Sequence, residues 1–350
     1  MPPDIVTAVQ HRRVVLPPSI DDRPPPAGAV VRELGGLTMG TRWSVRCAAL
    51  RTLDLTVVRR GIERRLQEVI DQMSTWAPSS LLCRYGRAPA GSWYALPPEF
   101  FTVMQAALEV AEASGGAFAP TAAPLVDAWG FGPRDEDEPD APWPREADLQ
   151  AALPACGWRR AQLDKSAQRL LQPGGSRLDF SAIAKGFAVD HVSRYLSELG
   201  LHNHLVEIGG ELRGSGLKPD AQPWWTLIEE PTDRDGQSHI EGDMIIALHG
   251  LSVATSGDYR KVRVLDGARI SHTIDPRTGR PIGNGVAQVA VLHADCMWAD
   301  AWSTALGVLG PQEGMVLAEA RQLAARWLVR MPDGALREHL SPALMRMLDA

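Results

Sequence analysis

Apolar residues recur every three or four positions in three stretches of the first 200 residues, which predicts three helices. The first is expected over residues 59–73, the second over residues 99–114 and the third over residues 182–199. The apolar face of the first is formed by Ile62, Leu66, Val69, Ile70 and Met73. Glycines follow the second and third stretches, at residues 115–116 and 200, where helices commonly end.

Beyond residue 200 the pattern changes to short runs rich in β-branched and aromatic residues, separated by glycine-rich turns. These runs predict strands over residues 204–208, 224–230, 244–248, 262–265 and 287–293. Helical spacing returns over residues 298–309 and 311–330. Because the strands are grouped, with helices gathered around them, the sequence predicts an α+β fold rather than a succession of parallel βαβ units.

Two segments have the composition of irregular surface chain. Residues 1–30 are rich in proline and charge, and the three prolines at 24–26 oppose any regular element, so we expect a flexible arm. Residues 132–146 carry a run of acids, which we interpret as a solvated loop rather than an acidic functional patch. The remainder, residues 31–350, is expected to form a single domain.

Composition narrows the class of protein. With 350 residues, 45% apolar residues, a net charge of -6 and no run of Lys or Arg, the chain is typical of a globular protein and nucleic-acid binding is disfavoured. The four cysteines are widely spaced, so we expect reduced, mostly buried thiols rather than disulfides or a zinc site. No membrane span, signal peptide or lipobox is recognisable. We therefore expect a cytoplasmic protein, or a periplasmic one if the N-terminus is incomplete.

A lone lysine, Lys185, stands at the expected start of the third helix among small residues and beside Gly186. Free backbone N–H groups at a helix start, together with one cation, suit a phosphate or a pyrophosphate. The alternative is a lysine that extends to solvent from an ordinary amphipathic helix, and residues 178–190 by themselves favour that alternative. The segment is neither a P-loop nor a GxGxxG motif.

Asp300 and Thr304 are four residues apart on an expected helix and therefore share a face. A carboxylate and a hydroxyl in this arrangement are hard oxygen ligands that suit Mg²⁺, which takes few protein ligands. The alternative is an acid that interacts with the helix dipole and a threonine that bonds back to a carbonyl. Taken alone, the pair favours that structural interpretation.

His272 precedes a tight turn, which Asp275-Pro276 and Thr278-Gly279 predict. A neutral imidazole there could accept a proton, although a single histidine beside a turn is more often structural. Upstream, residues 254–259 place small hydroxyl side chains and a glycine in an expected loop, where a ligand could approach the backbone.

Two further segments are rich in glycine. Gly209 and Gly210 interrupt a strand-like run, which indicates a bulge or the close approach of a ligand. A second glycine pair, at residues 115–116, precedes Phe118, whose ring could lie against a flat heterocycle. Neither segment is decisive alone.

The order of the motifs carries more information than any one of them. In sequence they occupy residues 38–41, 73–80, 115–118, 179–186, 209–211, 254–259, 272–279 and 295–304. Together they resemble the ApbE family, the FAD:protein FMN transferases, from about residue 31 to about residue 309. The resemblance implies a single, T-fold-like α+β domain in which helices pack an antiparallel sheet.

The resemblance also implies roles for individual residues. Magnesium, or manganese in its place, would be held by the carbonyl of Ala182 and by the side chains of Asp300 and Thr304. FAD would be contacted by residues from five segments, namely Met39, Trp76, Ala117, Phe118, Ala119, Asp179, Lys185 and Ile274. The catalytic residues would be Lys185, Asp300 and His272, the last as the base.

The implied reaction is protein flavinylation, a post-translational modification. A Ser or Thr hydroxyl of an acceptor flavoprotein would attack the FMN phosphate of FAD, forming a phosphoester and releasing AMP. Two alternatives share the same residues. One is a flavin-binding module that has lost transfer, and the other is a magnesium-dependent FAD pyrophosphatase giving FMN and AMP.

The chain departs from the family pattern beside the presumed flavin pocket. Ala119 stands where an acid is usual after the phenylalanine, and Ala122-Ala123 stand where a Val-Gly pair is commoner. A hydrogen bond to a charged group contributes about 1.5–3 kcal/mol, so loss of such an acid would weaken flavin binding more than tenfold if the acid contacts the flavin.

Overall fold

The computed structural model describes residues 12–20, 24–133, 143–231, 240, 242–258, 262–265 and 268–348. Most of the expected acidic loop, at residues 134–142, and Tyr259 of the 254–259 motif lie outside the described residues. Four cysteines are free thiols, three of them buried and Cys83 half-buried, as the sequence predicts.

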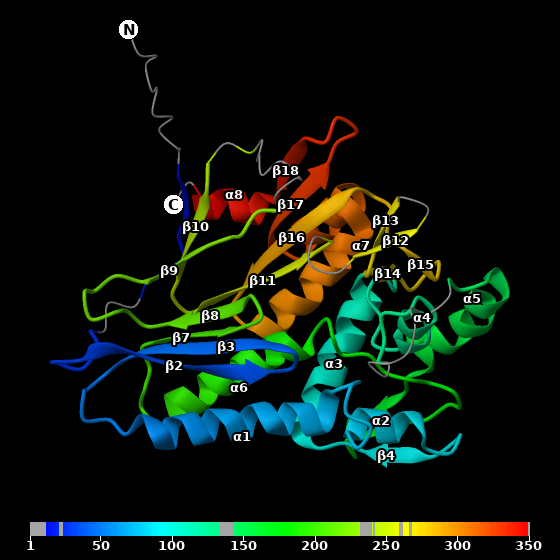
Figure 1. The fold of residues 1–350 in the computed structure, drawn as a ribbon, viewed down its shortest axis with the longest axis horizontal. Helices are drawn as coiled ribbons and strands as arrows, with labels where there is room; N and C mark the ends of the chain where they lie inside the picture. The colour runs from blue at the N-terminus through cyan, green and yellow to red at the C-terminus, as the bar shows by residue number, and fades with distance from the viewer. Residues whose placement is uncertain are drawn as a thin grey trace, which may run out of the picture.

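The centre of the fold is an eight-stranded sheet in the order β18-β17-β16-β11-β8-β7-β3-β2, and every neighbouring pair is antiparallel (Figure 1). The strands are β2 (Val30–Thr38), β3 (Thr41–Ala49), β7 (His204–Ile208), β8 (Glu211–Ser215), β11 (Leu251–Gly257), β16 (Val286–His293), β17 (Ala324–Arg330) and β18 (Leu336–Leu340).

Four long helices cover one face of this sheet. They are α1 (Leu55–Met73), α3 (Pro98–Ala113), α6 (Ala184–Glu198) and α7 (Cys296–Ala320). Helices α6 and α7 pack on the sheet and on each other, while α1 packs on α6 and α3 on α7 (Figure 1). The shorter helices are α2 (Leu81–Gly86), α4 (Ala123–Ala128), α5 (Glu146–Ala152) and α8 (Pro342–Leu348).

The opposite face of the sheet is covered by α8 and a three-stranded sheet in the order β1-β10-β9. Its strands are β1 (Arg13–Val15), β9 (Trp224–Leu227) and β10 (Met244–Leu248). Alternate residues of β16 enter the two cores, with Val289 and Val291 on the helical side and Ala290 and Leu292 on the other. Burial on both faces explains why this strand is continuously apolar.

Smaller elements complete the fold. The sheet order β4-β6-β5 joins β4 (Trp93–Ala95), β5 (Leu163–Asp164) and β6 (Arg169–Leu171). Two short hairpins join β12 (Val262–Leu265) to β13 (Ala268–Ser271) and β14 (Ile274–Asp275) to β15 (Arg280–Pro281). Single 3₁₀ turns lie at Leu153–Cys156 and Trp158–Arg160.

The predicted α+β class, with an antiparallel sheet packed by helices, is confirmed. The three N-terminal helices lie within a few residues of their predicted bounds, and the glycines after α3 end it through a bond from Gly116 N–H to the Ala111 carbonyl. The two helices predicted around residue 310 are continuous except at Gly310, where φ is 70° and ψ is 179° and the axis is broken.

The predicted helix over residues 311–330 is wrong at its C-terminal end. The helix ends at Ala320, Gln322 adopts a φ of 53°, and residues 324–330 form β17 inside the main sheet. Arg326 of this strand is buried and donates to Glu230 at 2.7 Å and to Glu338 at 2.6 Å. Tertiary burial therefore overrides the helical spacing of this segment, since its partners lie outside the segment, 12 and 96 residues from Arg326.

The expectation of an irregular N-terminal arm is also wrong at one place. Residues 13–15 form β1, which pairs in parallel with β10. Val15 is fully buried there, and Arg13 forms an ion pair with Glu338. Prolines 24–26 lie beyond this strand, so they do not prevent it from forming.

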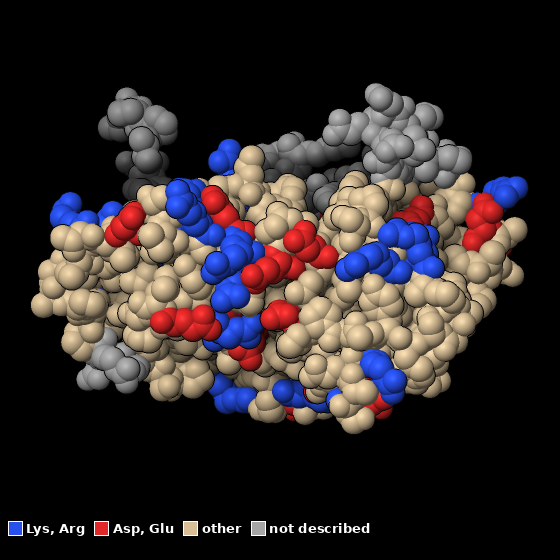
Figure 2. Space-filling model, turned by 90° about the horizontal axis from the view of Figure 1, so that it is seen from below, with Lys and Arg blue, Asp and Glu red and all other residues tan. Residues whose placement is uncertain are grey.

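The face lined by α1 carries basic and acidic side chains interspersed with one another rather than gathered by sign (Figure 2). Along α1 the charges alternate at helical spacing, as in the pairs Arg59–Glu63 and Arg65–Glu68. Among the described residues, none of the helices is both long enough and apolar enough to span a bilayer.

Candidate active site

A cavity of about 590 Å³ opens where the ends of the helices meet the sheet and the β14–β15 hairpin. Every residue to which the sequence analysis assigns a role lines it, although these residues come from widely separated parts of the chain. They are Met39, Trp76, Ala117, Phe118, Ala119, Asp179, Ala182, Lys185, His272, Ile274, Asp300 and Thr304.

Two tight hairpin turns bring the sheet to the cavity. Met39 and Gly40 join β2 to β3 with φ values of 47° and 70°, the left-handed pair that a two-residue hairpin favours. Gly209 and Gly210 join β7 to β8 in the same way, with φ values of 63° and 104°. The glycine pair is therefore a hairpin turn rather than the predicted interruption of one strand, and it places Glu211 in the cavity wall.

The sequence suggested that the ring of Phe118 lies against a flat ligand, but Trp76 presents more ring surface to the cavity. Trp76 is 62% exposed and lies at the rim, whereas Phe118 is 4% exposed and belongs to the main hydrophobic core. Because a stacking partner must present a ring face, Trp76 offers far more surface to a flat ligand than Phe118 does.

The segment around Ala119 is firmly held, even though it lacks the acid usual in the family. Ala117 and Ala119 are buried and line the cavity. The N–H of Asp179 donates to the Pro120 carbonyl at 2.8 Å, which fastens the two cavity segments together. Asp179 in turn accepts from the N–H of Ser181 at 2.8 Å, and this bond shapes the turn before α6.

The start of α6 does not offer a row of free N–H groups to a phosphate, which was one of the two interpretations of this segment. The N–H groups of Ile183 and Ala184 donate to the Phe180 carbonyl, and that of Phe187 donates to the Ile183 carbonyl. The N–H of Gly186 donates to the Asp300 carboxylate at 2.9 Å. The ammonium of Lys185 is thus the principal cationic feature at this end of the helix.

Lys185, Glu211 and Asp300 form a charged cluster on the cavity wall. The Lys185 ammonium pairs with Glu211, which is 2% exposed. Burial lowers the pKa of Lys185, but the charges of Glu211 and Asp300 outweigh it and the pKa is raised. Burial raises the pKa of Glu211 to about 7 and also raises the pKa of Asp300, in both cases against the attraction of Lys185.

Hydroxyl groups surround Thr304, the hydroxyl side chain of the expected metal ligands. Thr304 contacts Ser256 at 3.0 Å, Ser256 contacts Ser303 at 2.7 Å, and Ser303 donates to the Asp300 carbonyl at 2.8 Å. Residues 254–257, expected as a loop, are instead the end of strand β11. The strand fixes Ser256 rigidly against α7, which a loop would not do.

His272 reaches the cavity from the segment just before the predicted turn. That turn is confirmed, because the N–H groups of Thr278 and Gly279 both donate to the Asp275 carbonyl. The half-buried imidazole lies edge-on to Phe131, with ring centroids 6.3 Å apart. The histidine therefore faces the same space as Lys185 and Asp300.

The donor set at this end of the cavity suits a hard divalent cation. One carboxylate oxygen of Glu211 is buried without a hydrogen-bond partner, and burial raises the pKa values of Glu211 and Asp300 despite the nearby charge of Lys185. In the described part of the chain, no cluster of three His, Cys, Asp or Glu side chains could hold a metal. A carbonyl, a carboxylate and a hydroxyl, as at Ala182, Asp300 and Thr304, form the kind of sparse oxygen set that Mg²⁺ accepts.

Sequence reasoning assigned no role to Glu211, Ser256 or Asp190, although each lies within a motif it singled out. Glu211 follows the glycine pair, Ser256 is central in the 254–259 motif, and Asp190 is five residues after Lys185. For Asp190 the available signal was an acid in the mostly apolar run of residues 186–192, since buried carboxylates are rare unless they are paired or bind a ligand. The sequence around Glu211 and Ser256 carries no comparable signal.

The electrostatic interaction of Lys185 with the two buried carboxylates is expected to contribute to the free energy of unfolding. Lys185→Met leaves two buried carboxylates without their cation, so the free energy of unfolding is expected to fall by about 3 kcal/mol in urea titrations. Adding Glu211→Gln should recover most of that loss, because the repulsion is then removed. Lys218→Met breaks an ion pair with exposed Asp220 and should leave stability nearly unchanged. Equal losses for the two lysine variants would contradict the prediction.

The fold and the cavity together define an α+β protein with a small-molecule site that is apolar at one end and charged at the other. The sequence pattern of the ApbE family matches residues 39–327. The FAD:protein FMN transferase of Vibrio cholerae is 38% identical over 319 residues, covering 90% of this chain and 92% of that protein. The chain belongs to the ApbE family.

Solved structures agree with this assignment. The flavin transferase ApbE from Vibrio cholerae superposes with a TM-score of 0.82 at 37% identity, covering 91% of this chain and 99% of that one. The apo form of the Pseudomonas stutzeri flavinyl transferase ApbE gives a TM-score of 0.82 at 36% identity, with coverages of 92% and 98%.

Proposed function

We propose that this protein is an FAD:protein FMN transferase, which moves FMN from FAD to a Ser or Thr hydroxyl of an acceptor flavoprotein and releases AMP. The observation that carries the proposal is the common cavity. Residues that the family resemblance implies for FAD, for the cation and for proton transfer all lie on its wall. Relatives named for this activity match nearly the whole chain.

In this proposal the two ends of the cavity bind different parts of FAD. Trp76 and the apolar wall at Ala117 and Ala119 take the flavin ring system. Lys185 lies near the pyrophosphate, where its charge offsets the negative charge that grows on the leaving AMP. The raised pKa of Lys185 keeps its ammonium protonated throughout the physiological range.

Ala182, Asp300 and Thr304 would hold Mg²⁺, or Mn²⁺ in its place. When bound, the cation supplies further neutralisation of the phosphate oxygens. Asp300 is 3% exposed, and one of its oxygens is already fixed by the N–H of Gly186. Its orientation is therefore set before any ligand arrives, which lowers the cost of ordering the site.

His272 is the proposed base. The acceptor hydroxyl oxygen forms a bond to the FMN phosphorus, and the bond from that phosphorus to the oxygen bridging to AMP breaks. An imidazole nitrogen of His272 takes the hydroxyl proton, and AMP leaves with the bridging oxygen. Water in place of the hydroxyl would give free FMN and AMP.

The proposal is tested by incubating the protein with FAD, Mg²⁺ and a flavoprotein that carries a suitable Ser or Thr, followed by a denaturing gel under ultraviolet light. We expect a fluorescent acceptor band and one AMP released per flavin attached. An acceptor whose target hydroxyl is replaced by alanine is the matched control and should give no band. AMP and free FMN without a band would establish a pyrophosphatase instead, and FAD binding without AMP would establish a flavin-binding module.

A further inference from the structure

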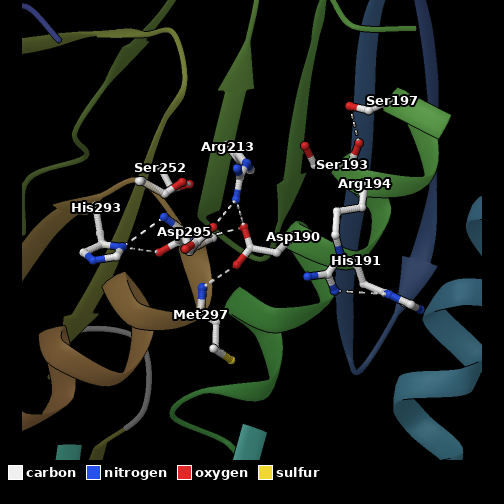
Figure 3. A network of polar contacts seen from close by, with 12 residues as sticks. Asp190, His191, Ser193, Arg194, Ser197, Arg213, Ser252, His293, Asp295 and Met297 are labelled. Atoms are coloured by element: carbon white, nitrogen blue, oxygen red, sulfur yellow. Dashed lines mark hydrogen bonds and ion pairs between the residues drawn. The ribbon is translucent and has the colours of Figure 1, made fainter. Parts of the chain in front are cut away.

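Asp190 is a buried acid of α6 that takes no part in the cavity wall. Its side chain accepts from the N–H groups of Cys296 at 3.0 Å and Met297 at 2.9 Å, the first two residues of α7. It also pairs with Arg213 of β8, and Arg213 reaches Asp295 at 3.0 Å (Figure 3). One carboxylate thus ties a helix, a strand and the start of a second helix together.

A second carboxylate makes the reverse connection. Asp300 of α7 accepts from the N–H of Gly186 in the first turn of α6 at 2.9 Å. Each helix therefore uses an acid to bind the first-turn N–H groups of the other. These N–H groups have no acceptor within their own helix, so each carboxylate supplies the hydrogen-bond acceptor that they lack.

The two helices approach unusually closely between these connections. A Cβ added at Gly186 would lie 2.3 Å from the Cys296 carbonyl oxygen and 2.8 Å from the Asp300 Cβ. The absence of a side chain at Gly186 is what permits this contact. The start of α7 is consequently packed directly against Gly186 of α6.

That position decides where the expected cation ligands lie. Asp300 and Thr304 are carried by α7, whereas Ala182 and Lys185 belong to the start of α6 and the turn before it. A functional site requires its groups to be held within about 0.5 Å of their working geometry. A shift of α7 along α6 would separate the ligands without disturbing the flavin wall at Trp76.

We infer that Asp190 is a positioning residue, which holds α7 against α6 so that Asp300 and Thr304 face Ala182 and Lys185 across one cation site. The inference rests on the proposed function for the identity of that site. Asp190 touches neither FAD nor the cation, and it acts through the backbone of Cys296 and Met297.

Asparagine cannot replace Asp190 in this role. The aspartate uses both oxygens as acceptors, one for Cys296 and Arg213 and the other for Met297. An amide of the same size would turn an NH₂ group toward one of these donors and would remove the charge that Arg213 pairs with. Asp190→Asn therefore changes the connection while nearly preserving side-chain volume.

The test is calorimetric titration of the full-length protein with MgCl₂, alongside FAD affinity measured by fluorescence quenching in EDTA. Loss of a group that orients a metal ligand typically weakens metal binding by about 10–100-fold. We expect Asp190→Asn to weaken Mg²⁺ binding by about that factor, with FAD affinity changed less than about threefold. Unchanged Mg²⁺ affinity in a folded Asp190→Asn protein would overturn the inference.

Two further variants separate positioning from simple loss of stability. Gly186→Ala forces the helices apart by a different route and should give the same selective loss of Mg²⁺ affinity, so it replaces Asp190→Asn if that variant does not fold. Ser193→Ala, on the same helix, removes a buried contact of 2.7 Å to His204 and is the matched control. An equal loss of Mg²⁺ affinity in Ser193→Ala would show a general structural effect and would refute the role.

Failure of the positioning role can be distinguished from failure of the proposed function, because the Mg²⁺ titration and the FAD affinity measurement need neither an acceptor protein nor turnover. If the native protein binds Mg²⁺ and the variants bind it weakly, the positioning role stands even if no FMN is transferred. If the native protein transfers FMN and the variants keep full Mg²⁺ affinity, the function stands and the positioning role falls. A native protein that binds no divalent cation would refute the positioning role directly.

Discussion

Asp300→Ala is expected to abolish FMN transfer, with a fall in kcat of about a thousandfold or more. The carboxylate is buried, lines the charged end of the cavity and is the one strong anionic ligand in the proposed cation set. Loss of electrostatic stabilisation at a phosphoryl centre typically costs several kcal/mol, and a single well-placed group contributes about 10²–10³ in rate. Gel fluorescence and AMP release, measured in parallel, give the change.

Asp300 also accepts the Gly186 N–H, so loss of activity has to be separated from loss of fold. Asp300→Asn keeps an acceptor oxygen of similar position and should remain folded while losing transfer. Glu319→Gln removes an exposed carboxylate from the same helix and should leave the rate unchanged. EDTA should reproduce the Asp300→Ala result with the native protein. Transfer by Asp300→Asn at more than a tenth of the native rate would argue against its role as a ligand.

His272→Ala is expected to slow single-turnover transfer by about 10²–10⁴-fold, the usual contribution of a positioned general base. FAD affinity should change only a few-fold, because the flavin contacts proposed at Trp76, Ala117 and Ala119 remain in place. Rapid-quench measurement of the acceptor band gives the rate, and quenching of flavin fluorescence gives the affinity.

The pH dependence of His272→Ala separates a base from a structural histidine. Removal of the group that accepts the hydroxyl proton should change how the transfer rate depends on pH, whereas removal of a structural histidine should leave the shape of the pH profile as it is. His202→Ala changes an exposed histidine outside the cavity and should keep the native profile. Native single-turnover rates in His272→Ala would exclude the histidine as the base.

The sequence predicted those elements whose position depends on residues within the element itself, such as helices α1 and α3. Helix α1 has a clear apolar face and α3 ends at a glycine pair, so both were found within a few residues. Strand β17 was missed because its buried Arg326 and Trp327 are satisfied by residues outside the strand, including Glu338 and the Leu306 carbonyl. The burial of Arg326 depends on Glu230, 96 residues away, and on Glu338 of the next strand, so the spacing of residues within β17 does not reveal it.

The site was predicted by the order of motifs rather than by the chemistry of any one segment. Residue chemistry alone suggested free N–H groups near Lys185, yet the structure shows that Asp300 and local carbonyls occupy them. The role of Glu211 depends on the β7–β8 turn, which carries it to Lys185 across 26 residues of sequence. Such contacts are properties of the tertiary fold, and spacing along the chain does not encode them.

The cavity wall begins at the β2–β3 turn, at Met39, and ends on α7, at Thr304. During synthesis the cavity cannot form until residue 304 has emerged and α7 has docked on α6, because the charged end is built from both helices. Closing contacts so distant in sequence is slow, and it comes late in folding. A ligand of this cavity can therefore stabilise only molecules in which α7 has docked on α6.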